Sequence, residues 1–165
     1  DPAAFHAPSL AALLARKSIG IRFPRRAVLR AGRASGRLLG GNLTVLAHLL
    51  GTRHAPDLRG ALLFLEDAGE GAYRLDRMLW HLRASGALDG IAAAIFGSFE
   101  PAPPRRKFPP DRPVLETVRE VFGPLDVPVV VGIPAGHLPG KWTLPIGGKA
   151  TVDTAKGRIE FEASR

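Results

Sequence analysis

The sequence GRLLGGNLTVLAHLLGT, which runs from Gly36 to Thr52, joins a short apolar stretch to a helical pattern through two glycines. Asn42 follows the glycines, and asparagine is a strong N-cap. The leucines after it fall at helical spacing, and Gly51 suits the end of a helix. Two glycines before a helix could also bind a phosphate, but the absence of Gly-x-Gly-x-x-Gly and of a P-loop lysine favours tight packing. The stretch predicts a strand, a tight turn and a helix.

Further strands and helices follow in mixed order. Buried strands are predicted at Leu62 to Leu65, 90–99 and 127–133, helices at Tyr73 to Ser85 and Val114 to Phe122, and a proline-rich loop at 101–113. The tail alternates around Lys156-Gly157, as a β-hairpin does. This order excludes a purely parallel sheet. It predicts an α+β fold, a layered β/β/α domain with a mixed sheet and a C-terminal β-hairpin.

The N-terminal part reads differently. Ser9 to Lys17 predicts a short helix with Ser9 as its N-cap, and short extended pieces interrupted by Pro24 follow it. Up to about Ala34 we expect a connecting arm rather than core. The first ten residues, DPAAFHAPSL, carry no Met, no basic region and no cleavage site, so they are not typical of a signal peptide or of a natural start. We therefore expect a piece of a longer protein, with an interdomain arm at 1–34 and a domain at 35–165.

Composition argues against several classes of site. The 165 residues are 45% hydrophobic and 23% charged, which is typical of one folded domain. The absence of cysteine excludes a disulfide or a thiolate zinc site, and the five histidines include no His-x-x-x-His pair, so we expect no metal. No apolar run approaches the ~20 residues that cross a bilayer, so we expect no membrane span.

The formal charge of +8 invites a nucleic-acid interpretation. The basic residues are scattered, however, with short clusters only at Arg25-Arg26 and Arg105-Arg106-Lys107. Aromatic residues do not alternate with these clusters, as a base-stacking surface would require. The pattern favours an arginine-rich surface over a nucleic-acid site.

Two polar residues could carry chemistry. Glu66 ends the buried run of ALLFLEDAGE (61–70), and His137 lies in the loop after another predicted strand. Such positions can converge at one sheet edge, where Glu66 could orient His137 as the base of a nucleophilic triad. Spacing alone leaves a purely structural role open for both. No serine lies in a Gly-x-Ser-x-Gly elbow, and only Ser98, after Gly97 at a strand end, has a plausible position for a nucleophile.

Three stretches in fixed order carry a family resemblance. They are GRLLGGNLTVLAHLLGT, PDLRGALLFLEDAGEGAYRLDRMLWHLRASGALDGIAAAIFGSF and PVVVGIPAGHLPGKWTLPIGGKATVD. In this order they closely resemble the C-terminal domain of the LD-carboxypeptidases, the serine peptidases that trim murein tetrapeptides and include the microcin-immunity peptidases. The resemblance covers roughly Gly36 to the C-terminus. It implies a β-rich layered domain with helices on one side.

The resemblance also implies a Ser-His-Glu triad divided between two domains. The Ser would lie in an N-terminal α/β domain absent from this chain, the Glu would be Glu66 and the His His137, with Asp67 and Glu70 only neighbours. The implied reaction releases the terminal D-alanine of a cytoplasmic murein tetrapeptide in peptidoglycan recycling, without metal or other cofactor. The resemblance suggests a homodimer. Because the nucleophile lies elsewhere, we expect the isolated chain to hydrolyse nothing.

Three further residues are candidates for substrate binding. Lys141 stands where family members often carry Asn, Trp142 could line a pocket, and Asn42 could reach the site although capping already explains it. Two alternatives stay open within the fold, namely a microcin-immunity type peptidase that cleaves a peptidyl- or aminoacyl-nucleotide and a noncatalytic binding module. A basic nucleic-acid binder is the third.

Overall fold

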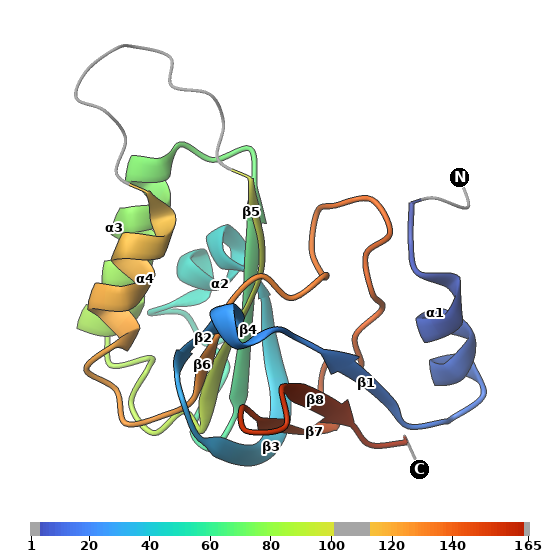
Figure 1. The fold of residues 1–165 in the computed structure, drawn as a ribbon. Helices are drawn as coiled ribbons and strands as arrows, with labels where there is room; N and C mark the ends of the chain where they lie inside the picture. The colour runs from blue at the N-terminus through green and yellow to red at the C-terminus, as the bar shows by residue number, and fades with distance from the viewer. Residues whose placement is uncertain (1–3, 101–112, 164–165) are drawn as a thin grey trace.

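The computed structural model of the protein describes residues 4–100 and 113–163, which form one eight-stranded mixed sheet and four α-helices (Figure 1). The helices are α1 (Ala7–Leu14), α2 (Leu43–Leu49), α3 (Ala72–Ala84) and α4 (Val114–Phe122), with a 3-10 turn η1 (Arg25–Ala27). The strands are β1 (Ile19–Arg22), β2 (Val28–Arg30), β3 (Arg33–Asn42), β4 (Leu62–Ala68), β5 (Ala93–Glu100), β6 (Val129–Val130), β7 (Lys149–Asp153) and β8 (Arg158–Phe161). Most of the predicted loop at 101–113 lies outside the described residues.

The sheet has the order β1-β8-β7-β3-β4-β5-β6-β2. Strands β3, β4, β5 and β6 run parallel, and β2 pairs antiparallel with β6. On the other side β7, β8 and β1 form antiparallel pairs, and β7–β8 is the predicted C-terminal hairpin. Strand β3 belongs to both parts, because Arg33–Arg37 pairs with β7 and Leu38–Asn42 pairs with β4. The predicted α+β class and mixed sheet are confirmed.

The core has two apolar layers that share the central strands. On β4, Leu63 and Leu65 face a cluster formed with α2, α3 and α4, while Leu62 and Phe64 face a cluster formed with β1, β7 and β8. This alternation is the period of two that any strand imposes on its side chains. Helices α2, α3 and α4 lie together on one side of the sheet, as predicted, and α1 lies apart on the other side (Figure 1). The result is a helix layer, a parallel layer and an antiparallel layer.

The two glycines before α2 do not form the predicted turn, because they belong to β3 and pair with β4, but they pack closely there. Gly40 has φ +112°, and a Cβ built there would lie 2.1 Å from the carbonyl oxygen of Phe64 on the adjacent strand. Only glycine fits such a contact and such a φ. Asn42 then caps α2 by accepting a 3.0 Å hydrogen bond from the Val45 amide. The predicted tight packing and N-cap are both present.

The N-terminal part differs from its prediction in two ways. The N-cap of α1 is His6, whose Nδ1 accepts a 3.3 Å hydrogen bond from the Ser9 amide, so Ser9 lies inside the helix. Residues 19–30 were expected to lie in a connecting arm, but they contribute to the core, because β1 and β2 pair within the sheet and Ile21 and Phe23 are buried. The local sequence did not indicate this, because each strand is short and its partner lies at least 99 residues further along the chain. Within 4–100 and 113–163, no helix has the length and apolar character needed to cross a bilayer.

Candidate active site

Glu66 and Asp67 are adjacent on β4 but serve opposite faces of the sheet. Both are buried, with 5% and 1% of their surface exposed. On the helix side, Asp67 Oδ2 accepts hydrogen bonds of 2.8 Å from both the amide and the hydroxyl of Thr44 in the first turn of α2. Asp67 therefore has a structural role at the start of a helix, where a carboxylate is favourable.

Glu66 makes its contact on the other face. Its Oε2 lies 2.6 Å from Nδ1 of His137, in the loop that follows β6. The glutamate side chain is 7% exposed, whereas the imidazole is 62% exposed. A carboxylate at Nδ1 favours the tautomer that carries its proton there, which leaves Nε2 as the free basic nitrogen. The pair combines a fixed buried carboxylate with an accessible base, and the structure brings the two predicted residues together.

Gly136 allows this approach. It has φ +110°, and a Cβ at this position would lie 2.7 Å from Ser98 Oγ and 2.8 Å from Glu66 Oε2. Any side chain here would push the loop away from the strand ends. In the sequence, only its position directly before His137 points to a role for Gly136.

Ser98 holds the same loop from β5. Its amide donates a 2.9 Å hydrogen bond to the carbonyl of Ala135. Its hydroxyl is buried and has no hydrogen-bond partner among the described residues. A buried hydroxyl cannot meet a peptide bond, so Ser98 does not fit the role of nucleophile.

A cavity of about 310 Å³ opens beside the dyad. Glu66 and His137 line it together with Lys141, Trp142 and apolar side chains that include Phe64 and Leu144. A mostly apolar cavity with a few convergent polar groups is typical of a small-ligand site. Two of the three predicted substrate-binding residues, Lys141 and Trp142, thus line the same cavity as the dyad. The third, Asn42, is absent from the lining, although its neighbour Gly41 contributes to it.

A larger cavity of about 500 Å³ lies between α2 and α3, and its lining includes His48, Glu70, Arg74 and Arg77. Both arginines have partners, because Arg74 is 3.1 Å from Glu70 and Arg77 lies over the ring of Tyr73. Hydrogen bonds to Tyr73 and Glu70 raise the pKa of Arg74 above its usual range. Histidines line both cavities, but only the smaller one has a histidine bonded to a buried carboxylate, so the chemistry is better placed there.

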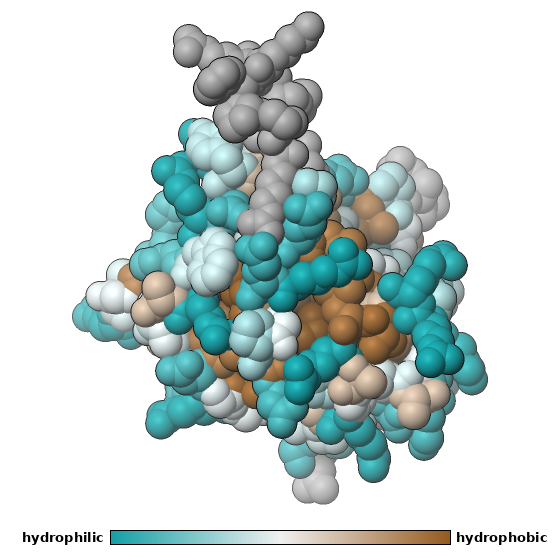
Figure 2. Space-filling view, turned by 60° about the vertical axis from the view of Figure 1, so that its left-hand side comes forward, coloured by the Kyte–Doolittle hydropathy of each residue, from teal (hydrophilic) through white to brown (hydrophobic). Residues whose placement is uncertain are grey.

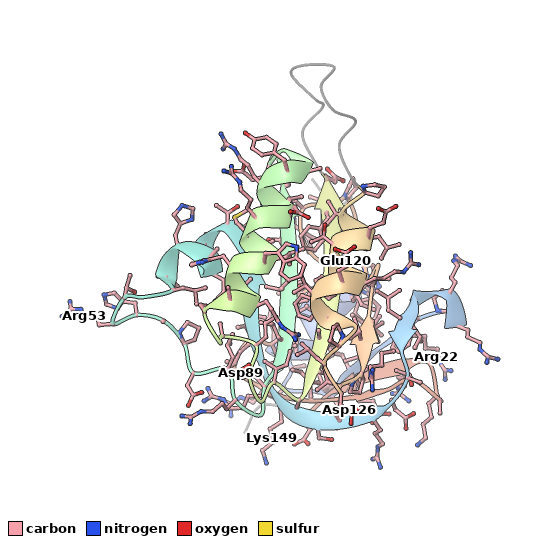
Figure 3. The ribbon with its side chains drawn as sticks, turned by 90° about the vertical axis from the view of Figure 1, so that its left-hand side faces the viewer. Arg22, Arg53, Asp89, Glu120, Asp126 and Lys149 are labelled. Carbon is pink, nitrogen blue, oxygen red and sulfur yellow. The ribbon has the colours of Figure 1, made fainter. Side chains whose placement is uncertain are left out.

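Charges elsewhere are distributed around the molecule. Figure 3 shows Arg22, Arg53 and Lys149 at separate edges. Several arginines pair with nearby carboxylates, for example Arg59 with Asp57 at 2.7 Å and Arg158 with Glu160 at 3.1 Å. Figure 2 shows hydrophilic residues that surround a hydrophobic area on the face in view. Among the residues that the structure describes, no group of three or more histidines and carboxylates could hold a metal ion.

Comparison with known proteins identifies the family. The family model described as the LD-carboxypeptidase C-terminal domain matches residues 35–152. The murein tetrapeptide carboxypeptidase of Pseudomonas aeruginosa is 36% identical over 128 residues, which are 73% of this chain and 39% of that protein. The crystal structure of muramoyltetrapeptide carboxypeptidase from Oxalobacter formigenes matches with a TM-score of 0.84 at 31% identity, covering 100% of this chain and 56% of that one.

A second kind of relative is the microcin C7 self-immunity protein of Escherichia coli. It is 32% identical over 126 residues, which are 74% of this chain and 35% of that protein. Its solved structures match with a TM-score of 0.72 at 28% identity, covering 84% of this chain and 41% of that one. One holds glutamyl sulfamoyl guanosine, and another is an active site mutant with alanine in place of a serine, an asparagine and a lysine. The chain spans less than half the length of the curated relatives it matches. It belongs to the LD-carboxypeptidase family and contains the family's C-terminal domain.

Proposed function

We propose that this chain supplies the base and the orienting carboxylate of a serine LD-carboxypeptidase whose nucleophile lies on a preceding N-terminal domain. The observation that carries the proposal is the 2.6 Å bond between buried Glu66 and exposed His137 beside a cavity. Residues 35–165 form the C-terminal domain in this proposal, and residues 1–34 lead to it from the N-terminal domain.

The chemistry follows from the two nitrogens of His137. Nε2 takes the proton of the serine hydroxyl as its oxygen attacks the scissile carbonyl, and the resulting imidazolium protonates the departing amine of D-alanine. Glu66 holds Nδ1–H and stabilises the imidazolium. A water molecule then attacks the acyl-enzyme, with Nε2 as base again, and releases the shortened peptide and the serine.

Two features support the need for a second domain. The buried hydroxyl of Ser98 does not fit a nucleophile. The chain also covers only part of its relatives, and an active site mutant of the microcin C7 self-immunity protein replaces a serine. We infer that the N-terminal domain places its serine at the open side of the 310 Å³ cavity.

The substrate we propose is a murein tetrapeptide, because that class of substrate gives two relatives their names. Its C-terminal carboxylate needs a positive partner, and Lys141 lines the cavity. Trp142 offers an apolar wall. Asn42 lies outside the cavity lining, next to Gly41; its side-chain oxygen caps α2, and its NH₂ group is left to donate to a substrate that extends past Gly41. We place the reaction in cytoplasmic peptidoglycan recycling and expect a homodimer.

A second function is favoured by the relationship to the microcin C7 self-immunity protein, one structure of which holds an aminoacyl sulfamoyl nucleoside. The same dyad would cleave the acyl bond of a peptidyl- or aminoacyl-nucleotide. The two functions differ in what fills the cavity beside Trp142: an amino acid with a free carboxylate, or a nucleoside without one.

The test compares both substrates on the full-length protein. D-Alanine release from murein tetrapeptide supports the first function, and cleavage of glutamyl sulfamoyl guanosine with no D-alanine release would replace it by the second. Binding without turnover of either would indicate a noncatalytic module. The isolated 165-residue chain should release no D-alanine, and release by this chain would disprove the divided triad.

A further inference from the structure

Helix α1 is attached to the molecule in an unusual way. Each of α2, α3 and α4 buries several side chains, most of them apolar, against the sheet. Among the described residues, α1 buries only Ser9, which is 2% exposed, while Leu14 of the same helix is 77% exposed. Leu10 and Leu13 are only partly buried, so apolar burial contributes less to the position of α1 than to that of the other helices.

Polar contacts hold α1 to the loop between β6 and β7. The His6 amide donates a 2.8 Å hydrogen bond to the carbonyl of Lys141, next to a backbone bridge between Phe5 and Lys141. Two residues after Lys141, the Thr143 amide donates a 3.0 Å hydrogen bond to Ser9 Oγ. The Ser9 hydroxyl in turn donates a 2.8 Å hydrogen bond to the carbonyl of His6. Figure 1 shows α1 beside this loop.

The residue between these two bonds is Trp142. Its indole stacks on the imidazole of His6, with ring centroids 4.3 Å apart and an interplanar angle of 12°. Its amide donates a 2.8 Å hydrogen bond to the carbonyl of Pro134, at the start of the segment that carries Gly136 and His137. The loop is thus fixed by α1 on one side and by the dyad's own segment on the other.

We propose that His6 and Ser9 are positioning residues that hold Lys141 and Trp142 against the substrate cavity. Neither His6 nor Ser9 lines that cavity, whereas Lys141 and Trp142 both do. The contacts of Phe5, His6 and Ser9 with residues 141–143, here called the α1 clasp, therefore couple the N-terminal arm to substrate binding. The role in catalysis rests on the proposed function, but the clasp itself does not.

The kinetic test uses the full-length protein and murein tetrapeptide. His6→Ala and Ser9→Ala should each raise KM about 3- to 10-fold with kcat within about twofold, since aromatic stacking and one buried hydrogen bond have energies of that order. In a Trp142→Leu background, His6→Ala should add little further change. Leu14→Ala, on the same helix but outside the clasp, should leave both constants unchanged. Unchanged KM in His6→Ala, or full additivity with Trp142→Leu, would overturn the proposal.

Two replacements of His6 separate its contacts. His6→Phe keeps a ring for Trp142 but loses the acceptor for the Ser9 amide, and His6→Asn does the reverse. Recovery of KM by Phe and not by Asn supports positioning through Trp142. Recovery by Asn alone would mean that His6 only caps the helix, which contradicts the proposal.

The indole N–H resonance of Trp142, assigned with Trp142→Leu, gives a readout without turnover. His6→Ala should shift this resonance through loss of the ring current, and Leu14→Ala should not. If the wild-type protein shows no D-alanine release, the proposed function fails and the resonance alone decides the clasp. An indole resonance that is insensitive to His6→Ala would disprove the clasp whatever the activity.

Discussion

The two faces of β4 use the same chemical group for different purposes. On the helix side, Asp67 binds an amide and a hydroxyl that are both fixed in α2. On the opposite side, Glu66 binds an imidazole that is 62% exposed and borders a cavity. Both carboxylates are buried, so burial does not distinguish them. The partners distinguish them, because Asp67 binds fixed groups of α2, whereas Glu66 binds an accessible imidazole, as the orienting carboxylate of our proposal would.

The strongest test removes the dyad. In the full-length protein, His137→Ala and Glu66→Gln should each lower kcat for D-alanine release by about 10³-fold or more, as loss of a base or of its orienting group does in a triad. The midpoint of thermal unfolding of His137→Ala should move by only about a few degrees, because the His137 side chain is mostly exposed. Steady-state kinetics and a thermal melt measure the two quantities. Activity within a few fold of wild type in either variant would mean that the triad is assigned to the wrong residues.

The next test moves Glu66 and His137 apart without removing either. Gly136→Ala places a methyl group 2.7 Å from Ser98 Oγ and 2.8 Å from Glu66 Oε2, and such a displacement should lower kcat by roughly 10²-fold.

Gly132→Ala is the matched control, because Gly132 also has positive φ, +71°, but no atom lies within 4 Å of its built Cβ. It should lose only about 1 kcal/mol of stability to backbone strain and keep its activity. Equal loss of activity in the two variants would show that strain, not crowding, is responsible.

The third test addresses the other face. Asp67→Ala removes the acceptor of two hydrogen bonds at the start of α2 and should lower the free energy of unfolding by about 1–3 kcal/mol. kcat should stay within about twofold, because Asp67 faces away from the cavity. Asp67→Asn, which keeps one acceptor oxygen, should recover part of the stability. Urea titration and D-alanine release measure the two outcomes, and a loss of activity larger than that of Glu66→Gln would reverse the roles assigned here.

The smallest effect concerns Asp57, a carboxylate exposed on the surface. Hydrogen bonds from Arg59 lower the pKa of exposed Asp57 to about 2 from its ordinary 3.8. A lowered pKa stabilises the folded state above the unfolded pKa, and that contribution disappears as the pH falls through about 2. The thermal midpoint of wild type should exceed that of Asp57→Asn slightly at pH 6, and the difference should shrink at pH 3. A difference that grows on acidification would contradict the assignment of Arg59 as the cause.

Local patterns in the sequence predict local structure well here. The helix predicted from Val114 to Phe122 has those bounds, and the strand and the helix of 36–52 are both present, although Gly40 and Gly41 continue the strand instead of forming a separate turn. In these segments the apolar period and the capping residue act within a few positions of each other. Strands β1 and β2 were predicted as extended pieces, but their place in the sheet was not, because their partners β8 and β6 lie far along the chain.

The candidate site could likewise be predicted from the sequence only in part. Glu66 and His137 could be recognised from their residue types as a carboxylate and a base. No spacing rule links residues that are 71 positions apart, so only the order of the motifs indicated that the two would meet. The role of Gly136 was not predictable, since the atoms that would clash with its side chain belong to β4 and β5. The clasp on Trp142 likewise depends on His6, which has no local pattern in common with the loop.

The double pairing of β3 also bears on the order of events during synthesis. Its second half finds β4 within about thirty residues, so the parallel layer that holds Glu66 can assemble early. Its first half pairs with Lys149–Asp153, and β1 pairs with Arg158–Phe161, so the antiparallel layer must wait for more than a hundred further residues to leave the ribosome. Between these stages the apolar face that carries Leu62 and Phe64 is uncovered. A nascent chain of this protein is therefore most vulnerable to aggregation from the time β4 has formed until β7 and β8 have been made, an interval that outlasts the synthesis of His137.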